Sequence, residues 1–260
     1  MGLLGRALAL TGIITGLLAF GLPFAAGSRY VDDGTLAACL LVLLSLASWL
    51  PAEIGWERFG AVAGAGAFGL FLNVPASAAF DKLGFLHSGA WLGLCTLLIP
   101  IGALVMWAAH GPVRTRATPP SRETVGLPLA AAGLVLIVVG IWLDALDGGP
   151  TYWNLSASGH AVGILMLLLV ALNVLLLAGP LVVSVPSLRS LDLIVAALTC
   201  GFVEFAPVAS AFETIGDLGA GAWIEACAGA LLLAGVLRLQ FSTAAAASSP
   251  AAMPSPASAP

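Results

Sequence analysis

The chain has 260 residues, of which 60% are hydrophobic and 8% are charged. A soluble domain carries roughly 45–50% apolar and about 25% charged residues, so the composition argues against a water-soluble fold. Nine lysines and arginines, with a net charge of −4, are too few to neutralise a run of phosphates, and nucleic acid is not an expected partner. The composition indicates an all-α integral membrane protein with the lipid bilayer as its partner.

Apolar stretches of about 20 residues, the length that crosses the hydrocarbon core, predict a polytopic bundle of eight transmembrane helices. They cover residues 3–26, 35–51, 59–80, 88–109, 125–146, 159–179, 189–212 and 218–240. The first stretch has an alternative interpretation as a cleaved signal peptide, because Arg6 precedes its apolar run. Its length favours a retained helix, as does its similarity to the fifth stretch, in which Gly133 and Gly148 match Gly12 and Gly27.

The basic residues predict the orientation, because Lys and Arg are enriched in cytoplasmic loops. With a cytoplasmic N-terminus, seven arginines lie inside and only Arg29 and Lys82 lie outside. We therefore expect a multi-pass protein of the cell (inner) membrane with both termini in the cytoplasm. A linker rich in Pro and Arg, 111–124, joins residues 1–110 to residues 125–241, and the Ala/Ser/Pro tail 242–260 is expected to be disordered.

The chain is similar to itself. Residues 69–95 align without a gap on residues 201–227, and ten of the 27 positions are identical. This similarity predicts a duplication. Each copy has an even number of predicted crossings, so we expect two tandem four-helix repeats in parallel orientation.

Prolines and tryptophans are among the shared positions. Pro75 and Pro207 each remove a helical hydrogen bond, so both helices are expected to kink, and the carbonyl of Val203 is expected to be released in the second copy. Trp91 and Trp223 open the following helices, where an interfacial aromatic belt is expected.

The repeated hairpin consists of a glycine, a proline six residues later, a phenylalanine five further on, and a tryptophan that opens the next helix. This pattern, in 69–91 and 201–223, resembles the bacterial SPW-repeat membrane proteins. The Ser-Pro-Trp triplet itself is replaced by Val74-Pro75-Ala76 and Ala206-Pro207-Val208. The resemblance implies a membrane helix fold and no particular activity.

Two glutamates lie inside predicted helices of the second copy. Glu204 is about eight residues, or roughly 12 Å, from the outer end of its helix, and Glu225 is at a similar depth in the next one. If the two carboxyls face each other, they form a pair that shares a proton or binds a cation, with the Val203 carbonyl as a further oxygen ligand. The alternative is that each carboxyl is satisfied by a nearby hydroxyl or backbone group. The matching residues of the first copy are Leu72 and Gly93.

Further acids gather near the predicted outer surface. Asp144, Asp147, Glu213 and Asp217 are candidates for a mouth that concentrates cations, and the alternative is that they are ordinary solvated loop ends. Asp192 is expected on the inner side.

No metal-ligand, cofactor or catalytic motif is present, since the four cysteines and three histidines are scattered and HExxH, GxSxG and P-loop patterns are absent. We therefore predict no cofactor, no metal site and no catalytic residue. Two function classes remain. One is a small proton- or cation-coupled transporter or channel that uses Glu204 and Glu225. The other is a non-catalytic scaffold or accessory subunit that packs against another membrane protein or a second copy of the chain.

Overall fold

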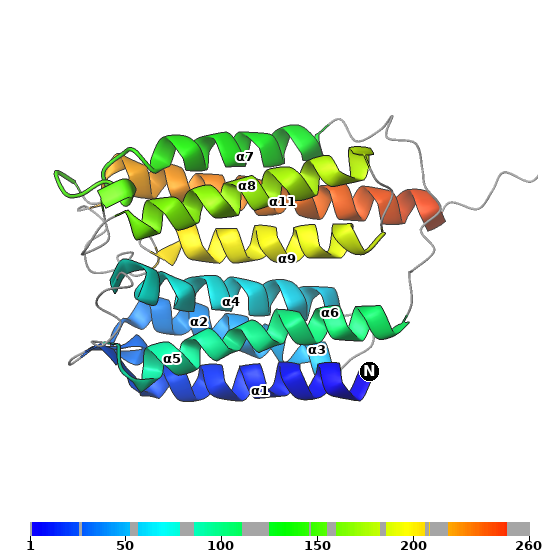
Figure 1. Cartoon of the computed structure of the whole chain (residues 1–260), viewed down its shortest axis with the longest axis horizontal. Helices are drawn as coiled ribbons and strands as arrows, with labels where there is room; N and C mark the ends of the chain where they lie inside the picture. The colour runs from blue at the N-terminus through cyan, green and yellow to red at the C-terminus, as the bar shows by residue number, and fades with distance from the viewer. Residues whose placement is uncertain are drawn as a thin grey trace, which may run out of the picture.

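The protein folds into two helical bundles that lie side by side, one from residues 2–110 (the first half) and one from residues 125–248 (the second half) (Figure 1). The computed structural model describes residues 2–25, 28–52, 57–78, 86–110, 125–145, 147–154, 160–182, 186–205, 208 and 218–248.

In its described residues, the first half contains a long N-terminal helix followed by three helical segments. Its helices are α1 (Gly2–Gly21), α2 (Gly34–Ala47), α3 (Trp49–Ala52), α4 (Glu57–Ala78), α5 (Ser88–Leu94) and α6 (Leu98–His110), with the 3-10 turn η3 (Cys95–Leu97) between the last two. The second half has four long helices, α7 (Gly126–Gly140), α8 (Ala161–Val182), α9 (Pro186–Val203) and α11 (Ala220–Ser248).

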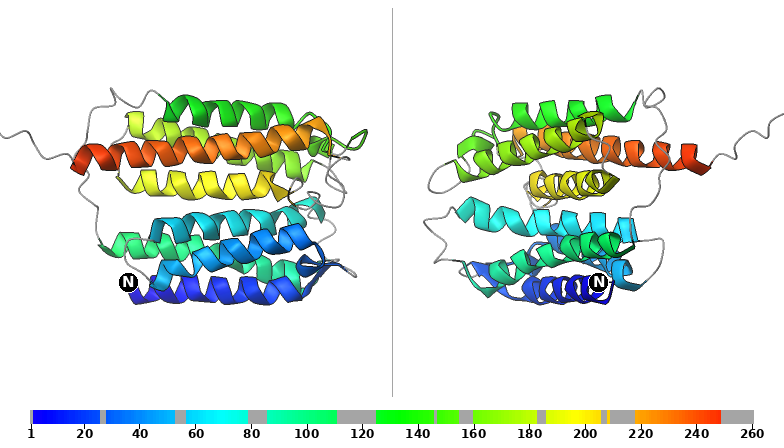
Figure 2. Two further views of the ribbon diagram at one scale, coloured as in Figure 1. Left: turned by 180° about the vertical axis from the view of Figure 1, so that it is seen from behind. Right: turned by 45° about the vertical axis from the view of Figure 1, so that its right-hand side comes forward.

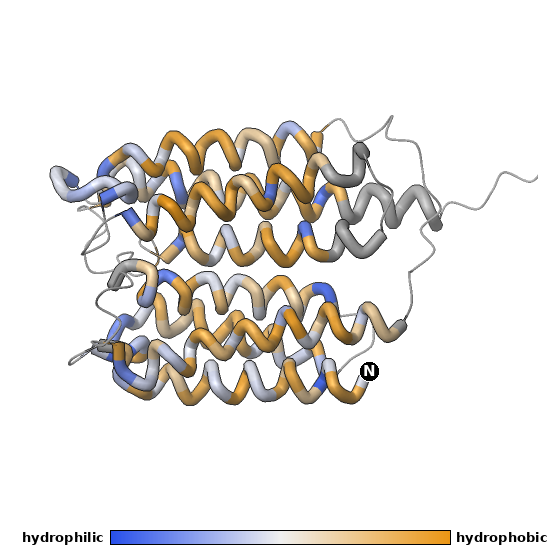
Figure 3. The backbone as a smooth tube through the Cα atoms, in the orientation of Figure 1, coloured by the Kyte–Doolittle hydropathy of each residue, from blue (hydrophilic) through white to orange (hydrophobic). Residues whose placement is uncertain are grey.

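Six helical stretches are long and apolar enough to cross a membrane, so the chain is an α-helical membrane protein. They are Gly2–Gly21, Gly34–Pro51, Arg58–Ala76, Ser88–Ala109, Ala161–Ala178 and Ala220–Leu239. Two further apolar helices, Gly126–Gly140 and Leu191–Val203, are shorter. Figure 3 shows hydrophobic residues along the middle of the helices and hydrophilic ones gathered toward their ends.

The two halves meet along α4 and α9, which lie next to each other in every view (Figures 1 and 2). Glycines allow this close approach, because a Cβ at Gly69 would lie 2.7 Å from the backbone nitrogen of Phe202, and one at Gly201 would lie 2.8 Å from the carbonyl carbon of Gly66. Asn73 Nδ2 also donates a hydrogen bond to the Phe202 carbonyl at 3.1 Å. Backbone contact of this kind makes the α4–α9 interface tight, as in other membrane helix pairs built on small residues.

Each half also contains a close pair formed by its first and last long helices. In the first half, a Cβ at Gly12 of α1 would lie 2.7 Å from Ile99 Cγ1 of α6. In the second half, a Cβ at Gly133 of α7 would lie 2.6 Å from the backbone nitrogen of Leu232 in α11. The two pairs therefore pack through glycine at corresponding places.

A short turn structure follows the first helix of each half. In the first half, β1 (Pro23–Ala25) pairs with β2 (Ser28–Arg29), and the 3-10 turn η1 (Tyr30–Asp32) buries Tyr30. In the second half, an isolated bridge between Asp144 and Thr151 precedes η4 (Tyr152–Asn154), which buries Tyr152. Next to β1, His87 N donates to Phe24 O at 3.0 Å.

Four boundaries differ from those expected from the sequence. The helix expected over 3–26 ends at Gly21, because the chain forms the strand Pro23–Ala25 there. The helix expected over 125–146 ends at Gly140, because the chain turns there toward the Asp144–Thr151 bridge. The helix expected over 189–212 begins at Pro186 and, as α9, ends at Val203. The tail expected to be disordered from residue 242 is helical as far as Ser248, because this stretch is rich in alanine, the strongest helix former.

Candidate functional site

Glu225 is a buried carboxyl without a partner. It lies in the second turn of α11, its side chain is 0% exposed, and neither carboxylate oxygen has a hydrogen-bond partner among the described residues. The carboxyl packs directly on α7, where a Cβ at Gly140 would lie 2.7 Å from the Glu225 carboxyl carbon. An ionised carboxylate in such surroundings costs several kcal/mol. The group is therefore expected to hold a proton or a bound cation.

Tyr152 lies in η4, in the segment that folds back over the end of α7. Trp153 N donates to Ile141 O at 2.9 Å and holds this segment in place. Tyr152 is 1% exposed, and its hydroxyl has no hydrogen-bond partner within the described part of the chain. Burial raises the pKa of Tyr152 above its usual range, and the carboxylates of Glu225 and Glu204 raise this pKa further.

Glu204 approaches the same stretch of α11 from the end of α9. It continues the helical hydrogen-bond pattern, since its nitrogen donates to Cys200 O and its carbonyl accepts from Val208 N, both at 2.9 Å. Its side chain is partly buried, and a Cβ at Gly229 would lie 3.2 Å from Glu204 Oε1. Gly229 is one turn, about 6 Å, further along α11 than Glu225. The two carboxyls thus lie against neighbouring turns of α11, without a hydrogen bond between them.

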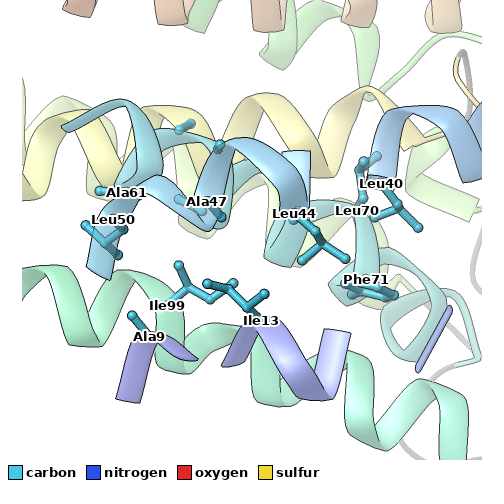
Figure 4. Close-up of a cluster of buried hydrophobic side chains, with 14 of the residues drawn as sticks. Ala9, Ile13, Leu40, Leu44, Ala47, Leu50, Ala61, Leu70, Phe71 and Ile99 are labelled. Carbon is cyan, nitrogen blue, oxygen red and sulfur yellow. The ribbon is translucent and has the colours of Figure 1, made fainter. Parts of the chain in front are cut away.

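A hydrocarbon side chain occupies the corresponding place in the first half. In the alignment of the two copies, Phe71 corresponds to Val203 and Gly93 to Glu225. The Phe71 ring is fully buried, and a Cβ at Gly93 would lie 2.6 Å from its Cδ1 atom. Tyr30 meets the same ring edge-on, with 4.8 Å between centroids. In Figure 4, Phe71 lies at one end of this apolar cluster.

This comparison shows an exchange of large and small side chains between two helices. In the first half, α4 supplies the large Phe71 and α5 the glycine, whereas in the second half α9 supplies the smaller Val203 and α11 the long Glu225. Phe71 packs on Gly93 in the first half, whereas Glu225 packs on Gly140 of α7 in the second. The two halves thus differ in polarity, with a phenyl ring in the first and a carboxyl in the second.

Two further polar positions lie deeper along α9. Asn173 Nδ2 donates to Thr199 Oγ1 and to Leu169 O, and Thr199 Oγ1 donates to Val195 O, all at 2.8 Å. Asn173 Oδ1 is buried and has no partner among the residues that the structure describes. Asp192 lies seven residues before Thr199 and is 6% exposed. Its Oδ1 atom also has no hydrogen-bond partner among the described residues.

Asp192, which the sequence predicts on the inner side, is buried. The helix starts at Pro186, so Asp192 lies in its second turn. Residues seven apart lie on nearly the same face of a helix, so Asp192 and Thr199 share one face of α9. That face also includes Val203, which is 1% exposed.

The acids proposed for an outer mouth are not gathered at the buried site. Asp144 and Asp147 are both exposed, on the turn between α7 and η4. The Asp144 carbonyl accepts a hydrogen bond from Gly221 N at 2.9 Å, which ties this turn to the start of α11. Glu213 and Asp217 lie outside the described residues.

The prolines and tryptophans shared by the two copies were expected to kink the helices and to form an aromatic belt. Pro75 is inside α4, which continues to Ala78. Pro207 lies outside the described residues, so the release of the Val203 carbonyl stays a prediction. Trp91 and Trp223 are 47% and 48% exposed near the starts of α5 and α11, so each presents its ring on the surface of the bundle.

Sequence reasoning missed Tyr152, Gly140 and Asp192 as members of the site. The available signal for Tyr152 was that Tyr30 stands in the same position after the first helix. Gly140 carries no polar signal, and only its contact with Glu225 reveals its role. Asp192 lies within the predicted helix 189–212, and only the structure shows that it is buried.

Within the described ranges, no group of three or more His, Cys, Asp or Glu side chains is placed to hold a metal ion. Comparison of the chain with protein-family models, with curated proteins and with solved structures gives no significant match.

Proposed function

We propose that this protein is a small proton- or cation-coupled transporter or channel of the cell (inner) membrane, and that Glu225 and Glu204 form its coupling site. The proposal includes eight membrane crossings, in two tandem four-helix repeats, with both termini in the cytoplasm.

Several contacts support the proposed duplication. Gly69 and Gly201, which match in the alignment of the two copies, lie in the same interface, each against the helix that carries the other. The bond from His87 N to Phe24 O has a counterpart in the bond from Gly219 N to Ala145 O at 3.1 Å. A duplicated chain whose copies associate about a pseudo-twofold axis is expected to have such reciprocal contacts.

The arrangement of the helices also supports the proposed orientation. The N-terminus, the start of α7 and the end of α11 lie at the same end of the molecule (Figure 1). The short strands and η4 lie at the other end (Figure 1). This arrangement agrees with an even number of crossings in each half, and the arginine bias puts the first end in the cytoplasm.

The single observation that carries the functional proposal is the burial of Glu225 with both oxygens unpartnered among the described residues. A group of this kind lowers stability, so its presence in an otherwise apolar bundle calls for a reason other than packing. Ionisable residues inside membrane proteins commonly mark ion or proton pathways. The first half supplies an internal comparison. Gly93 aligns with Glu225 there, and the buried neighbour at the aligned position of the preceding helix is Phe71.

A flux assay in proteoliposomes tests this function. Ion movement driven by a voltage or a pH gradient is measured for the wild type and for Glu225→Gln and Glu204→Gln, which keep the side-chain shape and remove the charge. We expect at least tenfold slower flux for Glu225→Gln and a smaller loss for Glu204→Gln. Asp33→Asn is the matched control, because Asp33 caps α2 in the first half and asparagine is an equally good cap. Equal flux in all four proteins would contradict the proposal.

The alternative function is a non-catalytic scaffold or an accessory subunit of a larger membrane complex. A row of large apolar residues on α8, Ile164, Leu168, Leu172 and Leu175, is 40–68% exposed and offers a face for another membrane protein or a second copy. This alternative predicts no flux from the purified wild type. It also predicts that polar substitutions on α8 prevent co-purification of a partner.

A further inference from the structure

We infer that the moving ion is a proton, and that it passes through the interior of the second half along α9, between Glu225 at the outer end and Asp192 toward the inner end. This inference rests on the proposed function and adds its substrate and its route. It assigns a role to Asp192 and Asn173, which otherwise remain unexplained buried polar groups.

The first support is the position of the oxygens that lack a partner in the described part of the chain. At the outer end are both oxygens of Glu225 and the Tyr152 hydroxyl, near the middle is Asn173 Oδ1, and toward the inner end is Asp192 Oδ1. All four residues are at most 6% exposed. Asp192 and Thr199, to which Asn173 is bonded, are separated by seven residues, or about 10 Å along α9. Unpartnered groups therefore recur at three depths inside one bundle.

The second support is that these atoms can all accept hydrogen bonds. Both hydrogens of Asn173 Nδ2 and the hydrogen of Thr199 Oγ1 are already donated within the protein. Asn173 Oδ1 therefore remains free to accept a hydrogen bond from water. Buried unpaired acceptors are the groups that internal water commonly satisfies. Water bound in this way can connect carboxyls that are too far apart to exchange a proton directly.

The third support is that the counterparts of Asp192 and Thr199 in the first half are apolar, although Tyr30, the counterpart of Tyr152, also buries a hydroxyl without a partner among the described residues. The alignment of the two copies, extended toward the N-terminus without a gap, pairs Asp192 with Gly60 and Thr199 with Ala67. Ala67 is fully buried, and a Cβ at Gly60 would lie 2.7 Å from Leu50 Cβ. The same fold is thus stable without the polar groups, so packing alone does not require them.

Close packing around Glu225 favours a proton over a metal cation. The carboxyl lies in contact with the backbone of α7 at Gly140 and is fully enclosed. A sodium or calcium ion needs about six oxygen ligands at 2.3–2.6 Å, and so a shell of free space around the carboxyl. A proton needs only one oxygen, and the water that relays it needs room for one small molecule beside the carboxyl instead of a full shell of ligands. A neutral carboxylic acid can also be buried without a counter-charge.

The proposed transfer conserves every atom. The Glu225 carboxylic acid gives its proton to water inside the bundle and becomes a carboxylate. The excess proton passes along water held at Asn173 Oδ1 and is taken up by the Asp192 carboxylate. Asp192 releases it at the inner side, and Glu225 takes a new proton from the outer side. Only O–H bonds form and break, and both carboxyls return to their starting states.

The test uses the full chain in proteoliposomes that contain a pH-sensitive dye, with a potassium gradient and valinomycin to set the voltage. We expect the lumen of wild-type vesicles to change pH at the same rate whether sodium or a large organic cation is outside. Glu225→Gln and Asp192→Asn should each slow this change at least tenfold. Asp33→Asn should leave it unchanged. A second measurement on the wild type avoids any folding defect of the variants. An apolar carbodiimide, which reacts with protonated buried carboxyls, should modify Glu225 and Asp192 in mass spectra and stop the flux.

The possible outcomes separate the inference from the proposed function. If the Asp192→Asn variant carries protons as fast as the wild type, and Asp192 gives no carbodiimide product, the route along α9 is overturned and the transport function stays intact. Glu225-dependent flux of sodium or potassium without a pH change would contradict the inference that the ion is a proton. It would agree with a cation channel. No flux of any of these ions through the wild type would overturn both.

Discussion

Replacing Glu225 by methionine is expected to make the protein more resistant to heat while abolishing ion flux. Methionine has a similar length and fills irregular space, so the volume beside Gly140 stays occupied. The variant removes a buried group whose two oxygens have no partner among the described residues. The cost of leaving such a group unpaired is about 1–3 kcal/mol. For a protein of this size, each 1 kcal/mol corresponds to a shift in Tm of about 2–4 °C.

The assay is thermal unfolding of the purified protein in detergent, followed by far-UV circular dichroism, together with the flux measurement. Leu232→Met is the matched control, because Leu232 is fully buried on the same helix and faces α7. This volume-conserving exchange should cost less than about 1.5 kcal/mol and keep the flux. A lower Tm for Glu225→Met than for Leu232→Met would show that the carboxyl stabilises the fold. That result would refute the reasoning that Glu225 lowers the stability of the fold and is present for function.

Three further predictions test the interface, the buried tyrosines and the orientation. Gly201→Val should lower the free energy of unfolding by about 1–3 kcal/mol, because its Cβ would lie 2.8 Å from a backbone carbonyl carbon of α4. Gly21→Val is the control, and it should have little effect on Tm because the space around Gly21 is open. Burial raises the pKa of Tyr30 and Tyr152, so the folded state keeps both phenols protonated above pH 10, where the unfolded chain loses these protons. Stability should therefore fall as pH rises above about 10, by at most about 1.4 kcal/mol per pH unit for each tyrosine, and less steeply in the double phenylalanine variant. Trypsin should cut the linker 111–124 in inside-out vesicles and spare it in right-side-out vesicles, and the opposite pattern would reverse the orientation.

Some features of the site were visible in the sequence because they depend on residue type and local order. Glu204 and Glu225 were conspicuous as acids within apolar stretches, and their similar depth followed from their distance to the connecting turn. The matching residues of the first half were also available from the alignment. What the alignment could not give was the helix against which each side chain packs. Phe71 packs on Gly93, and Glu225 packs on Gly140 of α7.

By itself, the sequence determined that the chain belongs in a membrane and where most of its helices lie. Hydropathy over about 20 residues and the positions of Gly, Pro and Trp are local properties that need no knowledge of neighbours. The tertiary structure alone decided that Glu225 faces Gly140 without a partner among the described residues, that Tyr152 joins it, and that Asp192 is buried. Each residue turns a helix by about 100°, so a boundary misplaced by a few residues changes which side chains face inward. Burial and pairing depend on the rotation and relative depth of packed helices, and these are fixed only when the helices meet.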